Sequence, residues 1–231
     1  MSNNISLYIA AYNAEKTIEK SIKSILQQTL KPKEIIIIND CSTDKTLNLL
    51  KKFNQIKIIN NKKNYGLAKS RNIALKYSKY NFLASIDSDV VCKKNWLETL
   101  FNTMVKKKAD LIGGKLIDKY IKEPANHWRS YYLKQNWGEK QINNPQFIFG
   151  ANFLLNKKKI KNLNIKYNET FRTNGEDVNF SKVLKSKNCN LYYEPRALCY
   201  HYQFDDITSL SKRYWRYSYY GAGSKKLTLT R

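Results

Sequence analysis

"ISLYIAAYNAEKTIEKSIKSILQQTLKPKEIIIIND", residues 5–40, has the pattern of a strand, a helix and a second strand. Residues 5–13 begin as an apolar run and end in a polar loop, as a buried strand does. Isoleucines then recur at helical spacing through 14–30, with Asn13 as the expected N-cap. The isoleucine-rich run at 34–40 is typical of a parallel strand that is covered on both faces. Together these segments predict a βαβ unit.

The same alternation continues to residue 108. The next predicted elements are, in chain order, helix 43–53, strand 56–60, helix 67–78, strand 82–87 and helix 95–108. Strands that alternate with helices favour an α/β fold with an open, mostly parallel sheet flanked by helices. Ligands of such sheets bind at the carboxyl ends of the strands. The polar loops at 10–13, 39–44 and 87–90 all follow strands, so we expect them to meet at one edge.

The pattern changes after Ala109, where strands and helices no longer alternate regularly. The expected elements are a strand at 111–118, an aromatic-rich segment at 126–137, a strand at 146–156, a helix at 174–186 and a strand at 191–202. No linker separates this mixed half from the first. We therefore predict a single domain over 1–231 with a variable second half.

The chain is strongly basic, with 42 Lys and Arg against 18 Asp and Glu and a net charge of +24. Such a charge is typical of proteins that bind nucleic acid or anionic lipid. Only seven of the basic residues are Arg, however, and Arg is the residue that reads bases through its planar fork. We therefore expect no nucleic acid as a partner and favour a solvated lysine surface, with a basic nucleic-acid-binding module as an alternative that predicts steep salt dependence.

Several features bear on location. The four cysteines form no CxxC pair, which favours reduced thiols and a cytoplasmic protein. No apolar run is long enough to cross a bilayer. Residues 209–227 combine Lys and Arg with Trp215 and several tyrosines. That mixture suits a lipid headgroup interface, so we expect a peripheral contact with an anionic membrane, at its inner face.

Asp87 and Asp89 lie one residue apart, at the end of the predicted strand 82–87. Like charges this close raise each other's pKa unless a positive group lies between them. Hard oxygen ligands suit divalent cations such as Mn²⁺ or Mg²⁺. The pair therefore predicts a metal site.

Six motifs, in this order, carry a resemblance to a known family: "SLYIAAYNAEKTIEKSI", "IIINDCSTDKT", "NYGLAKSRNIAL", "FLASIDSDV", "FGANFLL" and "NGEDVNF". From residue 6 to about 204 the chain resembles the inverting family 2 glycosyltransferases of the GT-A type. The resemblance implies a single GT-A-type domain, in which 1–108 bind a nucleotide and 109–231 bind an acceptor. It also implies a metal-dependent enzyme that moves a sugar from a nucleotide sugar, UDP-linked, to a hydroxyl of a glycan or a lipid-linked glycan.

The resemblance further implies which residues bind the donor. Those residues are Ala11, Tyr12, Asn13, Glu15, Asp40, Arg71, Asp87 and Ser88. Tyr12 and Asn13 lie in the loop where members of the family stack on the nucleotide base and form hydrogen bonds with it. Asp40 lies where an aspartate of the family usually accepts a hydrogen bond from the uracil N3. Arg71 could meet the diphosphate. Two residues depart from the family pattern: Ala11 stands where many members have Pro, and Asn39 stands where many have Asp. The identity of the base therefore follows less directly from the resemblance than the fold does.

The metal and the chemistry are implied in the same way. The expected metal contacts are Asp87, Asp89 and His201. The two aspartates match the family's DxD motif, and His201 matches a histidine that some relatives use in the same way. Asp177 matches the family's general base, and Glu176 orients the acceptor or the helix. A helix start alone would also stabilise these two carboxylates. A sugar-nucleotide transferase, the other enzymatic alternative, needs a glycine-rich phosphate loop that "AAYNAEKT" lacks.

Overall fold

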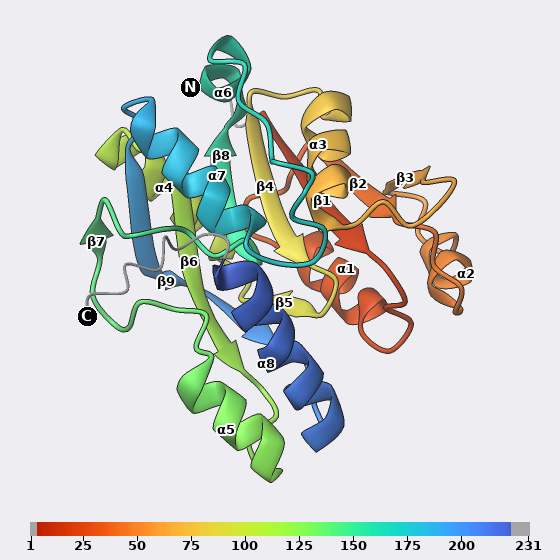
Figure 1. Ribbon diagram of the computed structural model, residues 1–231. Coiled ribbons are helices and arrows are strands. Elements are labelled where there is room, and N and C mark those ends of the chain that lie inside the picture. Colours follow the sequence, from red (N-terminus) through yellow and green to blue (C-terminus); the bar gives the residue numbers. More distant parts are fainter. Residues whose placement is uncertain (1–3, 223–231) are drawn as a thin grey trace, which may run out of the picture.

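The computed structural model describes residues 4–222 (Figure 1). Its sheet has the strand order β3-β2-β1-β4-β8-β6-β9-β5, and β7 pairs with β9. The strands of the first half are parallel: β1 (Ile5–Ala11), β2 (Glu34–Asn39), β3 (Lys57–Asn60) and β4 (Phe82–Asp87). The predicted mostly parallel half of the sheet is therefore confirmed.

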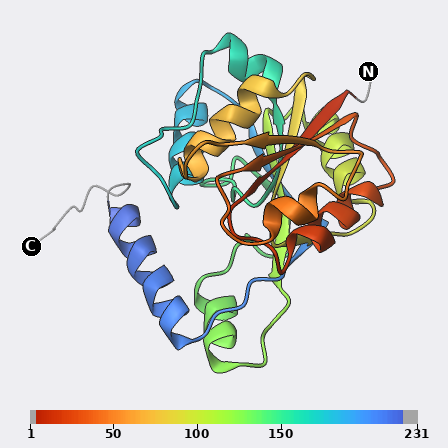
Figure 2. The same ribbon diagram turned by 90° about the vertical axis from the view of Figure 1, so that its right-hand side faces the viewer.

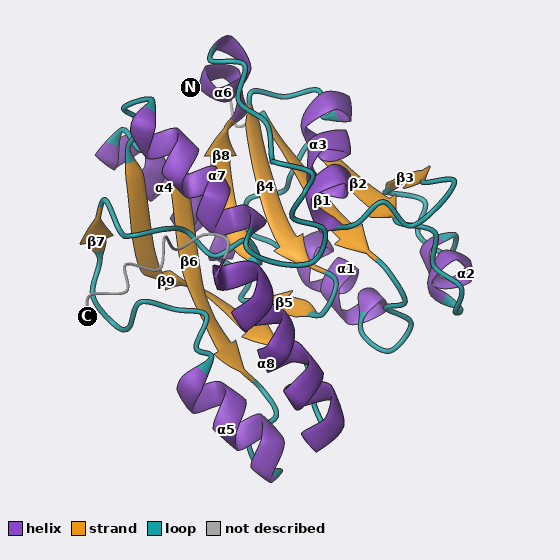
Figure 3. Ribbon diagram, in the orientation of Figure 1, coloured by secondary structure: helices purple, strands orange, loops and turns teal. Residues whose placement is uncertain are grey.

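The second half of the sheet is mixed, as the sequence predicted. Its strands are β5 (Val90–Cys92), β6 (Leu111–Asp118), β7 (Ile142–Asn143), β8 (Asn152–Asn156) and β9 (Leu191–His201). β8 runs antiparallel to both β4 and β6, whereas β6 and β9 are parallel. β5 and β7 are short and pair antiparallel with β9. One continuous sheet thus joins the two halves of the chain (Figure 3).

The register of the parallel strands places their carboxyl ends at the same level of the sheet. Ala11 lies opposite Asn39, Ala10 opposite Asp87, and Asn39 opposite Asn60. The loops that follow β1, β2 and β4 therefore leave the sheet at the same edge, which is where ligands of parallel sheets bind.

Helices cover both faces of the sheet. Their bounds are α1 (Ile18–Leu26), α2 (Thr46–Leu50), α3 (Leu67–Tyr77), α4 (Trp96–Lys107), α5 (Pro124–Tyr132), α6 (Lys157–Asn162), α7 (Glu176–Ser186) and α8 (Ile207–Ala222). One hydrophobic cluster contains the buried residues of α1 and α4, and a second contains those of α3, α6 and α7. Figure 2 shows α8 apart from the sheet, along one flank of the molecule, with α5 beside its first turns.

Several expected elements are shorter than predicted, and the helix expected at 43–53 is confined to α2. The helix expected at 14–30 spans only α1, and Thr17 rather than Asn13 is its N-cap residue. Asn13 instead has a φ of 49°, and its Oδ1 accepts a hydrogen bond of 2.8 Å from the Thr43 backbone N–H. The strand expected at 146–156 is confined to β8, because the backbone N–H of Gly150 donates to Asp177 rather than to a neighbouring strand.

No helix within residues 4–222 combines the length and the apolar character that a membrane span requires.

Candidate active site

A cavity of about 640 Å³ lies at the carboxyl end of β4, where the start of α7, the end of β9 and one side of α8 also meet. Six of the residues predicted from the sequence line it: Arg71, Asp87, Asp89, Glu176, Asp177 and His201. The fold therefore gathers acidic segments that are far apart in the chain into one site.

Arg71 is a buried cation at this cavity, with 1% of its surface exposed. Its Nη1 donates to the carbonyl oxygen of Gly150 at 2.7 Å. Its Nη2 lies 3.5 Å from Asp87 Oδ1 and 3.3 Å from Glu176 Oε1. A buried charge needs such partners, because an uncompensated one costs several kcal/mol. Arg71 thus joins the end of β4 to the start of α7, and its contact with a diphosphate stays a prediction.

Glu176 is almost completely buried, and its Oε2 has no hydrogen-bond partner in the described part of the chain. Burial and, to a smaller extent, the charge of Asp177 raise the pKa of Glu176 to about 8 against the opposing charge of Arg71. The side chain is therefore protonated at neutral pH. A protonated carboxyl cannot accept a proton, so Glu176 is poorly suited to act as a general base.

Asp177 is the second residue of α7, which begins after Gly175 in the left-handed conformation with a φ of 85°. Two backbone N–H groups hold its carboxylate: Gly150 donates to Oδ2 at 2.9 Å and Val178 to Oδ1 at 2.8 Å. The first turn of a helix is also a favourable position for an acidic side chain, because of the helix dipole. Asp177 therefore presents a fixed, hydrogen-bonded carboxylate to the cavity.

Asp87 and Asp89 each have a cationic partner of their own. Asp87 faces Arg71, whereas Asp89 Oδ2 lies 3.3 Å from His201 Nε2. Burial raises the pKa of Asp87 and outweighs the lowering effect of Arg71. Burial also tends to raise the pKa of Asp89, but the charge and the hydrogen bond of His201 lower it below its usual value. Asp89 is thus the more firmly ionised of the two carboxylates.

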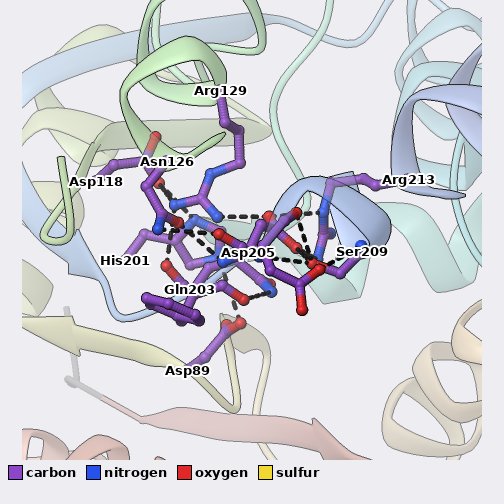
Figure 4. A network of polar contacts seen from close by, with 11 residues as sticks. Asp89, Asp118, Asn126, Arg129, His201, Gln203, Asp205, Ser209 and Arg213 are labelled. Atoms are coloured by element: carbon purple, nitrogen blue, oxygen red, sulfur yellow. Dashed lines mark hydrogen bonds and ion pairs between the residues drawn. The ribbon is translucent and has the colours of Figure 1, made fainter. Parts of the chain in front are cut away.

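His201 belongs to the network of polar contacts in Figure 4. Its Nδ1 lies 3.1 Å from Asp118 Oδ1, and Asp118 also accepts from Arg129 Nη2 at 2.9 Å. Burial lowers the pKa of His201, but the charge of Asp89 and the hydrogen bond with Asp118 raise it overall to about 9. The imidazole is therefore protonated at neutral pH and bridges two carboxylates.

The network continues from α5 to α8. Arg129 Nη1 donates to Asp205 Oδ2 at 2.6 Å, and Arg213 Nε donates to the same oxygen at 3.1 Å. Asp205 is 1% exposed and also accepts from the hydroxyl of Ser209. A buried carboxylate with two Arg partners fixes the start of α8 against α5. Nothing in the sequence indicated this contact.

The residues predicted to bind the base lie on the loops after β1 and β2, outside the lining of the cavity. Tyr12 is half exposed and available for stacking. Asn13 and Glu15 accept hydrogen bonds from the backbone N–H groups of Thr43 and Lys45. These bonds tie the two loops together and leave the ring of Tyr12 at the surface.

Asp40 is buried and has three hydrogen-bond donors around its carboxylate. Asn61 Nδ2 and the Tyr65 N–H donate to Oδ1 at 2.7 and 2.9 Å, and the Gly66 N–H donates to Oδ2 at 2.8 Å. Since each carboxylate oxygen can accept two bonds, one acceptor position on Oδ2 remains after these three. Asp40 therefore fixes the loop before α3. That it also accepts a hydrogen bond from a uracil stays a prediction.

Ala11 and Ser88 support these loops through their backbones. Ala11 is buried at the end of β1, and its carbonyl oxygen accepts from the Asp40 N–H at 2.8 Å. The carbonyl oxygen of Ser88 accepts from Ser21 Oγ at 2.9 Å, which ties the loop at 87–90 to α1.

A family model described as Glycosyl transferase family 2 matches residues 6–184. An uncharacterized glycosyltransferase of Haemophilus influenzae is 31% identical over 187 residues, which cover 73% of this chain and 58% of that protein. The chain belongs to glycosyl transferase family 2. The resemblance found in the sequence motifs is therefore confirmed.

Other relatives of this family 2 chain have more specific names. An Escherichia coli protein, UDP-Glc:alpha-D-GlcNAc-diphosphoundecaprenol beta-1,3-glucosyltransferase WfaP, is 46% identical over 87 residues, or 37% of this chain and 35% of that protein. The chain thus spans less than two thirds of the length of these relatives. A crystal structure of S. aureus TarS 1-349 matches with a TM-score of 0.71 at 19% identity, over 98% of this chain and 76% of that one. This likeness confirms the GT-A-type fold.

The family 2 site also contains residues that sequence reasoning missed. Arg213 and Tyr217 of α8 and Tyr132 at the end of α5 line the cavity. α8 follows the last motif of the family, and nothing in its sequence shows which side of the helix faces inward. Only the contacts of Asp205 with α5 and α8 place these side chains at the site.

The metal predicted for this family 2 site has a limited set of donors. No group of three or more His, Cys, Asp or Glu side chains within residues 4–222 is arranged to hold a metal ion. Asp89 is an ionised carboxylate with 23% of its side chain exposed. Mg²⁺ and similar ions often bind through one or two carboxylates, substrate phosphates and water. The carboxylate of Asp89 is therefore compatible with a metal that the donor helps to hold, and its role as a ligand stays a prediction.

A larger hollow of about 790 Å³ lies along the other side of α3 in the family 2 domain. None of the predicted site residues lines this hollow. Seven lysines do: Lys62, Lys69, Lys76, Lys79, Lys157, Lys161 and Lys166. Because catalysis needs the acidic and hydrogen-bonding groups found together in the smaller cavity, we place the active site there.

Proposed function

We propose that this chain is a metal-dependent, inverting glycosyltransferase that moves a sugar from a UDP-linked donor to a hydroxyl of a glycan or lipid-linked glycan. The observation that carries this proposal is the Asp177 carboxylate, held by the N–H groups of Gly150 and Val178 at the cavity shared with Asp87 and Asp89. Such a fixed carboxylate next to a donor site suits a general base.

In the proposed reaction, Asp177 takes the proton of the acceptor hydroxyl as the oxygen attacks the anomeric carbon of the sugar. The new bond joins that oxygen to the anomeric carbon, and the bond between this carbon and the diphosphate oxygen breaks. Attack opposite the leaving group inverts the configuration. Glu176 stays protonated and, with Arg71, positions the start of α7.

Asp89, together with Asp87, would hold Mn²⁺ or Mg²⁺ against the diphosphate. When bound, the metal neutralises the charge that develops on the departing nucleotide. His201 could join this set only after it loses the proton shared with its carboxylate neighbours. Its charge at neutral pH also suits a direct contact with the diphosphate.

The names of relatives support the choice of donor and acceptor. WfaP and a second Escherichia coli relative, WfgD, which is 37% identical over 112 residues, are named for transfer from UDP-Glc to a diphosphoundecaprenol-linked GlcNAc. TarS has been crystallised with UDP-GlcNAc. We propose the same classes here, with 1–108 binding the nucleotide and 109–231 the acceptor. A lipid-linked acceptor would bring the enzyme to the cytoplasmic face of a membrane.

A comparison of nucleotides tests the proposal. UDP with Mn²⁺ should raise the melting temperature well above the shifts that ADP and GDP give, because a ligand that binds only the folded state stabilises it by mass action. Slow hydrolysis in a panel of UDP-sugars should then identify the sugar. Equal shifts with all three nucleotides would contradict the uracil assignment. Binding to duplex DNA with steep salt dependence, and no effect of UDP, would support the nucleic-acid alternative.

A further inference from the structure

Exposed aromatic and aliphatic side chains gather on one part of the molecule. Within residues 4–219, whose side chains the structure describes, fourteen large apolar side chains are exposed, and ten of them lie at 120–132 and 204–219. We call these ten residues the α5–α8 face: Tyr120, Ile121, Trp128, Tyr131, Tyr132, Phe204, Ile207, Tyr214, Trp215 and Tyr219. Exposed patches of this kind mark surfaces that bind a partner.

Ring contacts make this face continuous across the two helices. Trp128 of α5 lies 4.8 Å from Tyr132 and 5.7 Å from Tyr214 of α8, between ring centroids. Figures 1 and 2 both show α5 and the first turns of α8 side by side and away from the sheet. The face therefore projects from the body of the domain.

The arrangement on α8 is amphipathic. At about 100° per residue, Ile207, Tyr214, Trp215 and Tyr219 fall within an arc of roughly 140°. Lys212 and Arg216, both exposed, come next around the helix on the side of Tyr219. Trp and Tyr favour the boundary between lipid tails and headgroups, and basic residues next to them attract anionic headgroups.

The same helices border the active site. Tyr132 at the end of α5 and Arg213 and Tyr217 of α8 line the 640 Å³ cavity. A surface that binds the α5–α8 face therefore lies next to the mouth of that cavity. An acceptor whose sugar is joined to a membrane lipid would reach the site from this side.

We propose that the α5–α8 face docks on an anionic lipid bilayer, which presents the acceptor to the cavity. Docking is supported by the exposed aromatic side chains and the basic residues beside them. The presentation of an acceptor, in contrast, rests on the proposed function. The occupant is a bilayer rather than a second copy of the chain, because an interface between two copies would bring the basic residues of both together.

Co-sedimentation with lipid vesicles tests the docking without any nucleotide, donor or acceptor, so its outcome is independent of the proposed function. The protein should sediment with vesicles that contain phosphatidylglycerol and much less with pure phosphatidylcholine. Tyr131→Ser/Ile207→Ser/Trp215→Ser should abolish sedimentation. All three side chains are more than 60% exposed, so this variant should fold. Tyr77→Ser/Val105→Ser removes exposed apolar side chains elsewhere and should bind like the parent.

A second pair of variants tests the charges. Lys212→Gln/Arg216→Gln should weaken binding to the anionic vesicles roughly 10-fold or more at low salt, whereas Lys51→Gln/Lys94→Gln, which removes the same charge elsewhere, should not. No sedimentation of the parent at low salt, or equal sedimentation of the serine variant and its control, would overturn the proposal. A concentration-dependent dimer that the serine variant abolishes would also overturn it, because a second copy would then cover the face.

Discussion

The guanidinium of Arg71 lies directly against the backbone of Gly150. Arg71 Nη1 donates to the Gly150 carbonyl oxygen at 2.7 Å, and a Cβ at position 150 would lie 2.8 Å from Arg71 Cζ. The N–H of the same glycine holds Asp177. Gly150, which belongs to the motif "FGANFLL", thus links the buried cation to the proposed base.

Gly150→Ala should therefore destabilise the domain by about 1–3 kcal/mol, the usual cost of overpacking a buried site. Thermal or urea unfolding measures this change. In an Arg71→Met background the same substitution should cost less, because the guanidinium that it overlaps is gone. Equal costs in both backgrounds would show that Arg71 is not the source of the strain.

Removal of the Asp89 carboxylate should abolish the metal dependence of nucleotide binding. We expect that Mn²⁺ increases the affinity of the parent for UDP and has no such effect on Asp89→Ala, since this carboxylate is the main proposed ligand of the metal. Isothermal titration calorimetry with and without Mn²⁺ measures both affinities. Asp206→Ala, at an exposed aspartate, is the matched control. An Asp89→Ala variant that keeps the Mn²⁺ effect would exclude this site.

Substitution of Tyr12 should weaken UDP binding without loss of stability. Tyr12 is 50% exposed, so Tyr12→Ala removes little buried surface. A lost base–aromatic stack should lower the affinity on the order of 10-fold. Tyr77→Ala, at a tyrosine that is 46% exposed, should leave the affinity unchanged. If both variants bind UDP like the parent, the base does not stack on Tyr12.

The pKa of Glu176 predicts a specific pH dependence of stability. Its folded-state pKa is raised from 4.5 to about 8, so folding favours the protonated form. The stabilisation is complete below about pH 4.5 and is lost as the pH rises through 8. Glu176→Gln mimics the protonated acid and should gain stability relative to the parent between pH 6 and 9, on the order of 1 kcal/mol or more.

Urea midpoints of the parent and of Glu176→Gln across this pH range measure the difference. Glu123→Gln, at an exposed glutamate, should track the parent at every pH. A constant difference between Glu176→Gln and the parent would mean that Glu176 does not titrate in this window.

The sequence predicted the parts of the site that depend on local pattern. Asp87 and Asp89 follow an apolar run, and Asp177 opens a helix with a regular apolar face, so their places at element ends could be read directly. The parallel half of the sheet followed from the regular alternation of strands and helices. Such features arise from neighbours in the chain.

Contacts between distant segments could not be predicted in this way. Arg71 was expected on a helix that faces the donor, and nothing in the sequence indicated its burial against Gly150, 79 residues away. The break before β8 has the same origin, because the segment gives up strand pairing to hold Arg71 and Asp177. α8 reaches the cavity through the buried Asp205, which lies beyond the last motif.

Asp177 is the proposed base of the sugar transfer, and Asp177→Asn is the variant that probes this role. This variant keeps the size of the side chain, removes its ability to accept a proton, and should leave the affinity for UDP nearly unchanged. Asp206→Asn is the matched control and should react like the parent.

The measurement is single-turnover transfer with saturating UDP-sugar and acceptor, because it separates the chemical step from binding. Asp177→Asn should lower the rate by about 10² to 10⁴, the usual contribution of a positioned general base. If the variant keeps more than about a tenth of the parent rate, well above the range expected for a lost base, Asp177 is not the base.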